Sequence, residues 1–440
     1  MVGITKMKAE KQKAEKEAFF CTTKGLSRLG LEQIPTQFQS HKHLIYSSPA
    51  TLAFNSPGAE GFGVKRAGLA VPDSIMLIVA PGCCGRNTSL ISSMKEYNDR
   101  FYYLMMDETD IVTGRHLKKI PKAVEEICSV CPKKPSVVMI CITCVDALLG
   151  TDMERVCKKA EEQVEIPVRP CYMYALTREG RKPPMVHVRQ SLYSLLEPGK
   201  KKGNVVNLLG FFSPLVDDCE IYDLLHSAGV KTIHEISRCK DYMEYQTMSE
   251  ANFNLVLHHE ARFAAEDFHN RLQIPFIELR RLYQIDKIEN QYHALGNALG
   301  VAFCDEKYKK QAEDALEKFR QKCPDASFAI GECLNADPFE LSLALIRYGF
   351  SVPEIYGTIT VENFTYIRSL AKISPETKVF SNMEPTMIYY DPAKSDVNLA
   401  IGKDACYYHP DCPYVMWNGK EQPYGYAGVR RLFEQLLEVV

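Results

Sequence analysis

Short apolar runs alternate with helical stretches along almost the whole chain, and this alternation restricts the fold more than any other feature. Runs such as IMLIVAPG and VVMICITC are rich in β-branched residues and end at turn residues or cysteines, which is typical of buried strands. Between them, GRHLKKIPKAVEEICSVC and GTDMERVCKKAEEQV repeat apolar residues at helical spacing. A strand–helix–strand alternation predicts parallel sheets covered by helices.

The alternation restarts twice, after EPGKKKGN (197–204) and near KCPDASFAIGECLNADP (322–338), and 440 residues are enough for several cores. We therefore expect an α/β protein with three doubly wound, Rossmann-like domains whose parallel sheets surround a central cleft. The expected ranges are an N-terminal helical tail at 1–45, a first domain at 46–200, a second at 201–322, a third at 323–405, and a C-terminal segment at 406–440 that packs back on the body.

Charge and composition exclude several classes of function. The formal net charge of -2 gives no general attraction to nucleic acid or to an anionic membrane. The longest apolar stretches are too short to span a bilayer, and the Lys- and Glu-rich N-terminus lacks the apolar segment of a secretory signal. Neither a P-loop nor a G-x-G-x-x-G motif after a strand is present. We expect a cytoplasmic protein, in an anaerobic setting, that binds no nucleotide, nucleic acid or membrane itself.

The sixteen cysteines point to metal or redox chemistry, because intracellular chains seldom use cysteines as a disulfide framework. Doubly wound sheets bind ligands beyond the carboxyl ends of their strands. Cys83 and Cys84 follow the apolar run 75–79, and Cys144 follows VVMICIT, so all three are expected at such strand ends. Adjacent cysteines rarely bridge each other, which leaves their thiols available for other uses.

Other patterns compete with this interpretation. Paired C-x-x-C motifs at Cys128/Cys131 and Cys141/Cys144 suggest zinc, but residues three apart on a strand face opposite sides. The second pair could therefore bind one metal only if the strand ends between its members. His258 and His259 end the strand-like run FNLVLHH, and a strand end at a cleft favours a functional role for them.

Three stretches together resemble the component 1 family of nitrogenase and nitrogenase-like reductases. They are APGCCG (80–85), MDETDIVTGRHLKKIPKAVEEI (106–127) and ITCVDALLGTDMERV (142–156), and the C-terminal EQPYGYAGVRRLFEQL is also similar to the family's last segment. By this resemblance Cys84 and Cys144 occupy cluster-ligand positions, and Cys83 is an additional thiol.

The chain departs from the family in two places. Gly58 and Ala59 stand where nitrogenase-type subunits carry a further cysteine, so the resemblance implies a [4Fe-4S] cluster shared between two subunits. Cys84 and Cys144 of each subunit would be its ligands, with Cys83 as a spare. The region VLHHEARF (256–263) has no cysteine to hold the family's molybdenum–iron cofactor. His258 and His259 are therefore expected to act as proton donors or as ligands to something else.

The resemblance implies the catalytic component of an ATP-dependent reductase, working as a homodimer or as a heterodimer with a related subunit. A separate ATP-hydrolysing iron protein would deliver electrons through the shared cluster to a tetrapyrrole or a small sulfur compound. Two alternatives remain open. One is a non-catalytic scaffold for the assembly of a metal cluster, and the other is a zinc-binding structural protein.

Overall fold

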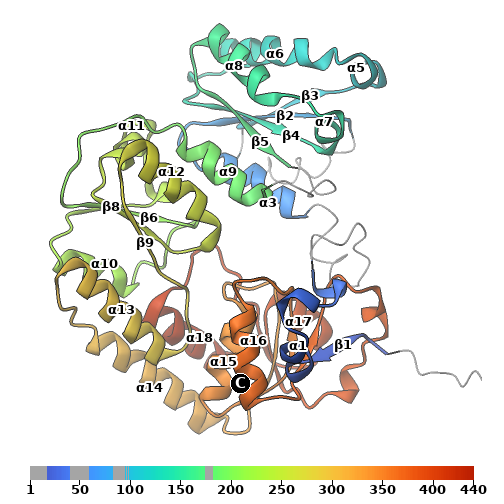
Figure 1. The fold of residues 1–440 in the computed structure, drawn as a ribbon, viewed down its shortest axis with the longest axis vertical. Coiled ribbons are helices and arrows are strands. Elements are labelled where there is room, and N and C mark those ends of the chain that lie inside the picture. The colour runs from blue at the N-terminus through green and yellow to red at the C-terminus, as the bar shows by residue number, and fades with distance from the viewer. Residues whose placement is uncertain (1–16, 40–58, 83–94, 96, 98, 174–181) are drawn as a thin grey trace, which may run out of the picture.

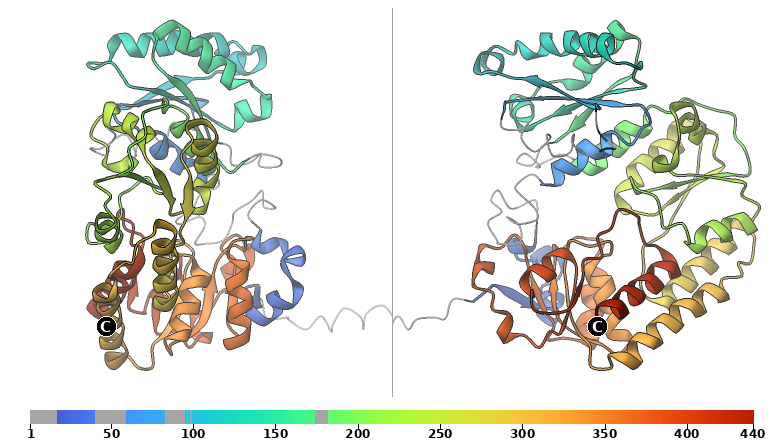
Figure 2. Two further views of the ribbon diagram at one scale, coloured as in Figure 1. Left: turned by 60° about the vertical axis from the view of Figure 1, so that its left-hand side comes forward. Right: turned by 180° about the vertical axis from the view of Figure 1, so that it is seen from behind.

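The computed structural model describes residues 17–39, 59–82, 95, 97, 99–173 and 182–440. Cys83 and Cys84 lie outside these residues. The described chain forms three sheet-and-helix units, seen from the front in Figure 1 and from two further sides in Figure 2. The expected α/β class with three sheets is confirmed, and all their strands are parallel except the edge strand β1 (Phe20–Thr22) of the third sheet. None of the helices in these ranges is both long and apolar enough to cross a membrane.

The first sheet has four parallel strands in the order β3-β2-β4-β5. Alternate residues of β2 face two different cores, which explains why the whole strand is apolar. Ile75, Leu77 and Val79 pack with α6 and α8, whereas Met76, Ile78 and Ala80 pack with α3 and α9. The strands are β2 (Ile75–Ala80), β3 (Phe101–Met105), β4 (Val138–Ile142) and β5 (Val168–Tyr172); the helices are α3 (Ala59–Gly68), α5 (Glu108–Thr113), α6 (His116–Val130), α7 (Cys144–Leu149), α8 (Met153–Val164) and α9 (Pro184–Tyr193).

The second sheet repeats this plan with four parallel strands in the order β7-β6-β8-β9. Helix α9 packs against α12 as well as against β5, so it joins the first and second units. The strands are β6 (Val205–Leu209), β7 (Thr232–His234), β8 (Phe253–Val256) and β9 (Phe276–Glu278); the helices are α10 (Glu220–Ser227), α11 (Tyr242–Gln246) and α12 (Arg262–Leu272).

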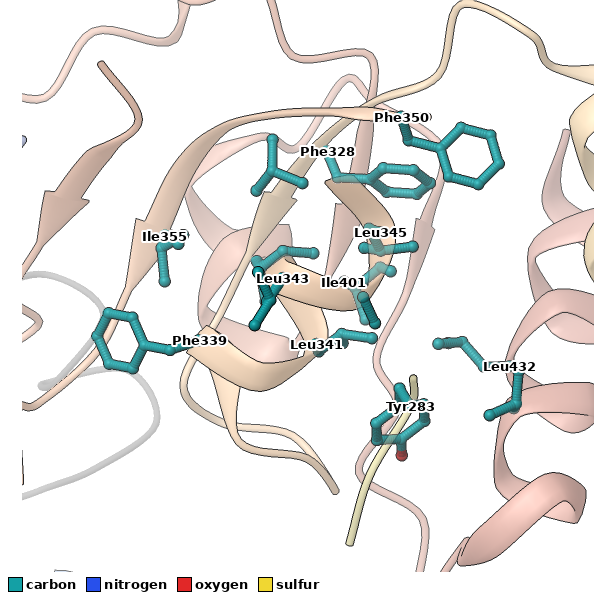
Figure 3. Packing of buried hydrophobic residues seen from close by; sticks show 14 of the residues in the cluster. Tyr283, Phe328, Phe339, Leu341, Leu343, Leu345, Phe350, Ile355, Ile401 and Leu432 are labelled. Carbon is teal, nitrogen blue, oxygen red and sulfur yellow. The ribbon is translucent and has the colours of Figure 1, made fainter. Parts of the chain in front are cut away.

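The third sheet has six strands in the order β1-β12-β11-β10-β13-β14, and its core is shown in Figure 3. Its strands are β1 (Phe20–Thr22), β10 (Ser327–Ile330), β11 (Ser351–Tyr356), β12 (Lys378–Phe380), β13 (Leu399–Ile401) and β14 (Tyr414–Val415); its helices are α1 (Thr23–Leu29), α15 (Pro338–Arg347), α16 (Phe364–Ile373) and α17 (Lys403–Tyr408). The edge strand β1 is antiparallel to β12. Residues 20–29, expected as part of a helical tail, therefore belong to the third unit.

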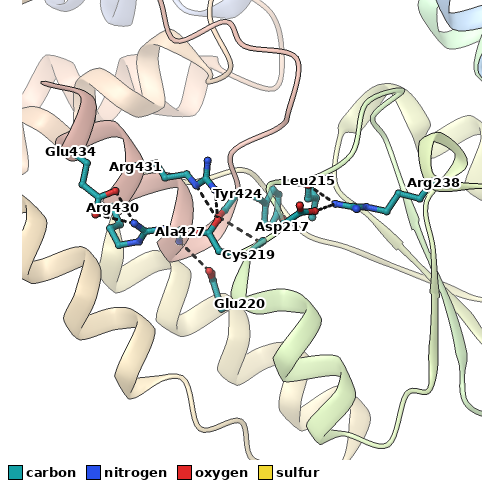
Figure 4. Close-up of polar contacts among 11 residues, drawn as sticks. Leu215, Asp217, Cys219, Glu220, Arg238, Tyr424, Ala427, Arg430, Arg431 and Glu434 are labelled. Atoms are coloured by element: carbon teal, nitrogen blue, oxygen red, sulfur yellow. Dashed lines mark hydrogen bonds and ion pairs between the residues drawn. The ribbon is translucent and has the colours of Figure 1, made fainter. Parts of the chain in front are cut away.

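Helices α13 (Ile285–Leu299) and α14 (Glu306–Lys322) lead along the chain from the second sheet to the third. The C-terminal helix α18 (Gly425–Val439) packs against both of them. Buried residues of α13 and α14 share a core with the third sheet, although the expected boundary at 322 places them in the second domain. Helix α18 packs against α14, as expected of a C-terminal segment that returns to the body. Buried Glu220 accepts hydrogen bonds from the amides of Tyr426 and Ala427 at the start of α18, as Figure 4 shows for Ala427. A carboxylate is favourable at a helix N-terminus, so this contact fixes α18 on α10.

In all three sheets the order in which strands are added reverses at the same point. The chain adds strands to one side of β2, β6 and β10, and then crosses to add β4, β8 and β13 on the other side. Ligands of doubly wound sheets bind beyond the strand ends at such reversal points. The strand pairs β2/β4, β6/β8 and β10/β13 are therefore the places to search for a site.

Candidate functional site

A cavity of about 580 Å³ lies where the carboxyl ends of the second and third sheets meet. Its walls come from the segments that follow β6, β8 and β9 on one side and β10 and β11 on the other. Helix α9 contributes Arg189, and α16 contributes Tyr366. This cavity agrees with the expected central cleft, and both candidate histidines line it.

His258 and His259 follow β8 after one residue, Leu257, at the reversal point of the second sheet. Their rings stack with centroids 4.5 Å apart, and Nδ1 of His258 accepts a 3.4 Å hydrogen bond from the amide of Glu260. Gly210, which follows β6, has a φ of +141°, and a Cβ there would lie 2.8 Å from the backbone nitrogen of His258. Only glycine allows the two strand ends to approach this closely.

Burial lowers the pKa of His258 well below its ordinary value of 6.5. The positive charges of Arg189 and Arg281, and the neighbouring His259, act in the same direction. The His258 ring is therefore neutral near pH 7, and the Glu260 amide that donates to Nδ1 favours a proton on Nε2. In this state the ring is suited to donate a hydrogen bond, but not to supply a proton as an imidazolium acid.

Two arginines stand beside this ring in different electrostatic situations. Buried Arg189 is held by the Glu260 carboxylate at 2.7 Å and by the carbonyl of Gly210 at 2.7 Å. The Arg281 guanidinium stacks on the Phe211 ring, 4.3 Å from its centroid, and donates to the neutral side chain of Gln422 at 2.7 Å.

No carboxylate of the described residues pairs with Arg281, and its buried Nε has no hydrogen-bond partner there. Burial lowers the pKa of Arg281, but an arginine stays protonated in proteins. The second unit thus presents an uncompensated positive charge to the cavity, which favours an anionic ligand.

The third unit presents carboxylates to the same cavity. Oδ1 of Asp337 accepts from the amides of Phe339 and Glu340 at the start of α15, while burial raises the pKa of Asp337 to about 6. Glu332 accepts from the Thr358 amide at 2.8 Å. The cavity therefore has a cationic wall on the second unit and an acidic wall on the third, and none of the described residues that line it is a cysteine.

The reversal point of the first sheet has a different character. Val79 of β2 pairs with Ile142 of β4, so the chain leaves both strands at the same edge of the sheet. β4 ends at Ile142, and Cys144 is the first residue of α7, whereas Cys141 is buried within β4. Cys141 and Cys144 thus lie on different elements. Cys144 is where strand-end reasoning expects it, and Cys83 and Cys84 follow β2 outside the described residues.

A buried histidine–carboxylate pair supports α7 next to Cys144. His116 at the start of α6 contacts Oδ1 of Asp146 through Nε2 at 2.8 Å, and both side chains are essentially unexposed. Among the described residues, Oδ2 of Asp146 and Oγ1 of Thr143 are buried without a hydrogen-bond partner. The sequence gives no signal for this pair, because its members belong to different helices and to no common motif.

This edge fits the implied iron–sulfur group as far as the structure describes it. Next to Cys144 in the sequence, the Thr143 and Asp146 oxygens are buried and have no partner among the described residues, which leaves them available to a further group. A cysteine thiolate is the ordinary protein ligand of such a cluster. In the described ranges, no three His, Cys, Asp or Glu residues are grouped so that they could hold a metal ion.

Two other cysteine patterns are structural in the described part of the chain. Cys131 ends α6, and its Sγ lies 3.1 Å from the hydroxyl of Tyr102. His409, which the sequence places between Cys406 and Cys412, is buried and contacts Glu354 at 3.1 Å. Neither arrangement supports the zinc alternative.

Comparison with known proteins agrees with the fold. Residues 60–440 match the family described as nitrogenase component 1 type oxidoreductase. The chain is 25% identical over 418 residues to the nitrogenase iron-molybdenum cofactor biosynthesis protein NifE of Sinorhizobium fredii, covering 89% of this chain and 82% of the relative. The NifE of Mesorhizobium japonicum is 26% identical with the same coverage, 89% and 82%.

A solved structure titled "Nitrogenase Cp1 at pH 6.5" shares the fold, with a TM-score of 0.70 and 18% identity over 90% of this chain and 92% of that chain. The expected family and fold are thereby confirmed. The chain belongs to the nitrogenase component 1 type oxidoreductase family.

Proposed function

We propose that the chain is a scaffold that holds an anionic metal–sulfur cluster as cargo during its assembly and then releases it. The guanidinium of Arg281 carries this proposal: no carboxylate of the described residues pairs with it, and the described lining of its cavity contains no cysteine. The similarity to proteins named for cofactor biosynthesis supports it, since two of them match 89% of the chain.

The reason lies in how strongly each kind of contact holds a cluster. A thiolate bond to iron is covalent and keeps a cluster in place, as a resident electron carrier requires. Charge-assisted hydrogen bonds from arginine and a neutral His258 each contribute about 1.5–3 kcal/mol, and they are broken by exchange with water. A cavity that uses only the second kind of contact suits a cargo that must leave.

The strand end of the first sheet is assigned a separate task in this proposal. Cys84 and Cys144, with the same two residues of a second subunit, would hold a resident [4Fe-4S] cluster, and Cys83 would be a spare thiol. The second subunit would be an identical copy or a related chain. An ATP-hydrolysing iron protein would be the source of electrons for the cluster.

A catalytic reductase is the second candidate, and Asp337 is the observation that favours it. A carboxyl group with a pKa of about 6 at the cavity wall can deliver a proton near neutral pH, which His258 cannot. In this case the cavity would bind a substrate such as a tetrapyrrole with acidic side chains or a small sulfur compound. The cationic wall would serve both candidates, so the two differ in turnover rather than in binding.

Binding to the cavity can be tested with tetrathiomolybdate, a small and coloured metal–sulfur dianion. We expect Arg281→Gln to weaken its binding about tenfold, since one charge-assisted contact is lost. Arg262→Gln is the matched control, because Arg262 lines the same cavity but is neutralised by Glu278 at 2.6 Å. Its affinity should stay within about twofold of wild type. Equal affinities for the Arg281 and Arg262 variants would contradict the anionic-cargo site.

Turnover separates the scaffold from the reductase. Cluster-loaded protein is offered a reduced iron protein, ATP and a tetrapyrrole or thioether, and product is measured. The scaffold predicts no product above background and transfer of iron to an apo-acceptor protein. Sustained product formation that Asp337→Asn abolishes would establish the reductase instead.

A further inference from the structure

A groove lined by fewer residues than the cavity lies between α1 and α16 on the third unit. It encloses about 560 Å³ and is open to solvent along its length. Helices α1 and α16 pack directly against each other, although α1 lies near the start of the chain and α16 near its end. Four basic side chains line the groove: Lys24, Arg28, Arg368 and Lys372.

The four cations form one row on each of the two helices. Lys24 and Arg28 are four residues apart on α1, and Arg368 and Lys372 are four residues apart on α16. Side chains at this spacing lie one helical turn apart on the same face. Ser27, Ala371 and Pro375 complete the lining, and none of them carries a charge.

Little negative charge in the described ranges balances these rows. Lys24 has one weak partner, Glu376 at 3.8 Å, and both side chains are well exposed. Arg368 stacks on the Phe364 ring of its own helix, 5.0 Å from the centroid. No carboxylate of the described chain lies within ion-pair distance of Arg28 or Lys372. A concentrated positive groove on a protein of net charge -2 is not a consequence of overall composition.

Helix α16 links this groove to the cavity. Asn363 and Tyr366, at the start of α16, line the cavity, whereas Arg368 and Lys372 further along line the groove. A protein held in the groove would therefore lie against a helix that also forms part of the cavity wall.

We propose that the groove between α1 and α16 docks an acidic helical segment of the protein that exchanges cargo with the cavity. The exchange rests on the proposed scaffold function, whereas the docking rests on the groove alone. Carboxylates spaced one helical turn apart match both rows of cations. None of the residues that line the groove is aromatic, whereas single-stranded nucleic acid is usually held by stacking on aromatic rings, so the lining favours an acidic protein segment.

The test uses the full chain and three probes. They are a helical Glu/Ala peptide with glutamates four residues apart, a scrambled peptide of the same composition, and a single-stranded oligonucleotide of equal charge. Affinities are measured at several salt concentrations for wild type and for the variant Arg28→Glu with Lys372→Glu. The control is Lys287→Glu with Lys310→Glu, which changes the net charge equally on exposed lysines outside the groove.

We expect the spaced peptide to bind wild type and the control equally, and to bind the groove variant at least about tenfold more weakly. The scrambled peptide should bind wild type more weakly than the spaced peptide. Equal binding of the spaced peptide to the groove and control variants would overturn the proposal. Tighter binding of the oligonucleotide than of the peptide would also overturn it and would assign the groove to nucleic acid.

Measuring tetrathiomolybdate binding to the groove variant separates the test of the docking groove from the test of the cavity. Tetrathiomolybdate affinity should be unchanged in the groove variant, because neither substituted residue lines the cavity. If the groove variant loses the peptide but keeps tetrathiomolybdate, the docking site stands whatever the fate of the scaffold proposal.

Discussion

The first and second sheets have the same strand order, but their reversal points carry different chemistry. Between β2 and β4 the described chain places Cys144 beside a buried His116–Asp146 pair and two oxygens without partners. Between β6 and β8 it places Gly210 against His258, with Arg189 and Arg281 close by. One edge carries a cysteine at the start of a helix, and the other carries positive charge.

Under the proposed function, this difference gives two sheets of the same topology different tasks. The position beyond the strand ends is common to both sheets, because it follows from the parallel topology. The side chains placed there decide whether a ligand is retained by covalent bonds or held reversibly by charge. Changing one edge should therefore leave the other intact.

The largest expected effect is at the first edge. Cys144→Ala should remove the resident cluster, so the iron that an excess of apo-acceptor protein cannot withdraw from anaerobically loaded protein falls to background. Cys141→Ala is the control, because Cys141 is a buried residue of β4 three positions earlier. That variant should keep its iron. Full iron retention in Cys144→Ala would remove Cys144 from the ligand set.

The pair behind Cys144 gives the next largest effect. His116→Ala leaves the buried Asp146 carboxylate without its main partner and should lower the free energy of unfolding by about 3 kcal/mol. His116→Gln keeps a donor near Asp146 and should recover part of this loss. Chemical denaturation of the two apo variants measures the difference. Equal stabilities would show that the contact contributes nothing beyond packing.

At the second edge, the close approach of two strand ends can be disturbed directly. Gly210→Ala places a Cβ 2.8 Å from the backbone nitrogen of His258, at a φ of +141° that residues with a side chain rarely adopt. We expect a loss of about 2 kcal/mol in the free energy of unfolding and weaker tetrathiomolybdate binding. Gly203→Ala is the control, because open space surrounds that position. A Gly210 variant as stable as the control would refute the close approach.

The smallest expected effect is a pH dependence from His258. The pKa of His258 is lower in the folded chain than in the unfolded chain. Below about pH 6.5 the unfolded chain therefore binds a proton that the folded chain does not, and the free energy of unfolding decreases as the pH is lowered. The side chain is 34% exposed, and solvent screening reduces this contribution to about 0.5 kcal/mol between pH 6.5 and 5.5.

His258→Gln should flatten the stability profile in that window and leave it unchanged above pH 7. Burial also lowers the pKa values of His187 and His234. Their contribution to the pH dependence of stability is the same in wild type and in His258→Gln, so it cancels in the comparison. A steeper profile in the variant would contradict the assigned direction of the shift.

Local pattern was sufficient to predict much of this molecule. Apolar runs located β2, β4 and β8, and the rule that ligands bind beyond strand ends directed attention to Cys144 and His258. Both predictions use only residues next to one another in the sequence. The family resemblance then supplied the role of Cys144, which no local pattern contains.

The features that sequence reasoning missed depend on contacts between distant segments. Arg189 comes from α9 and Arg281 follows β9, and neither belongs to a motif that would mark it as a cavity residue. The edge strand β1 joins β12 from the opposite end of the chain, so it was taken for part of a tail. Such contacts follow from packing, and one sequence does not reveal them.

The most direct test of the central claim is a release experiment. Anaerobically loaded protein is mixed with an excess of an apo-acceptor protein, and the iron remaining on the chain is followed over time. The two different edges predict two phases, an early loss from the cavity and a retained fraction at the thiol edge. Arg281→Gln should remove the early phase, and Cys144→Ala should remove the retained fraction. A single phase that both variants alter equally would contradict the division of function between the two edges.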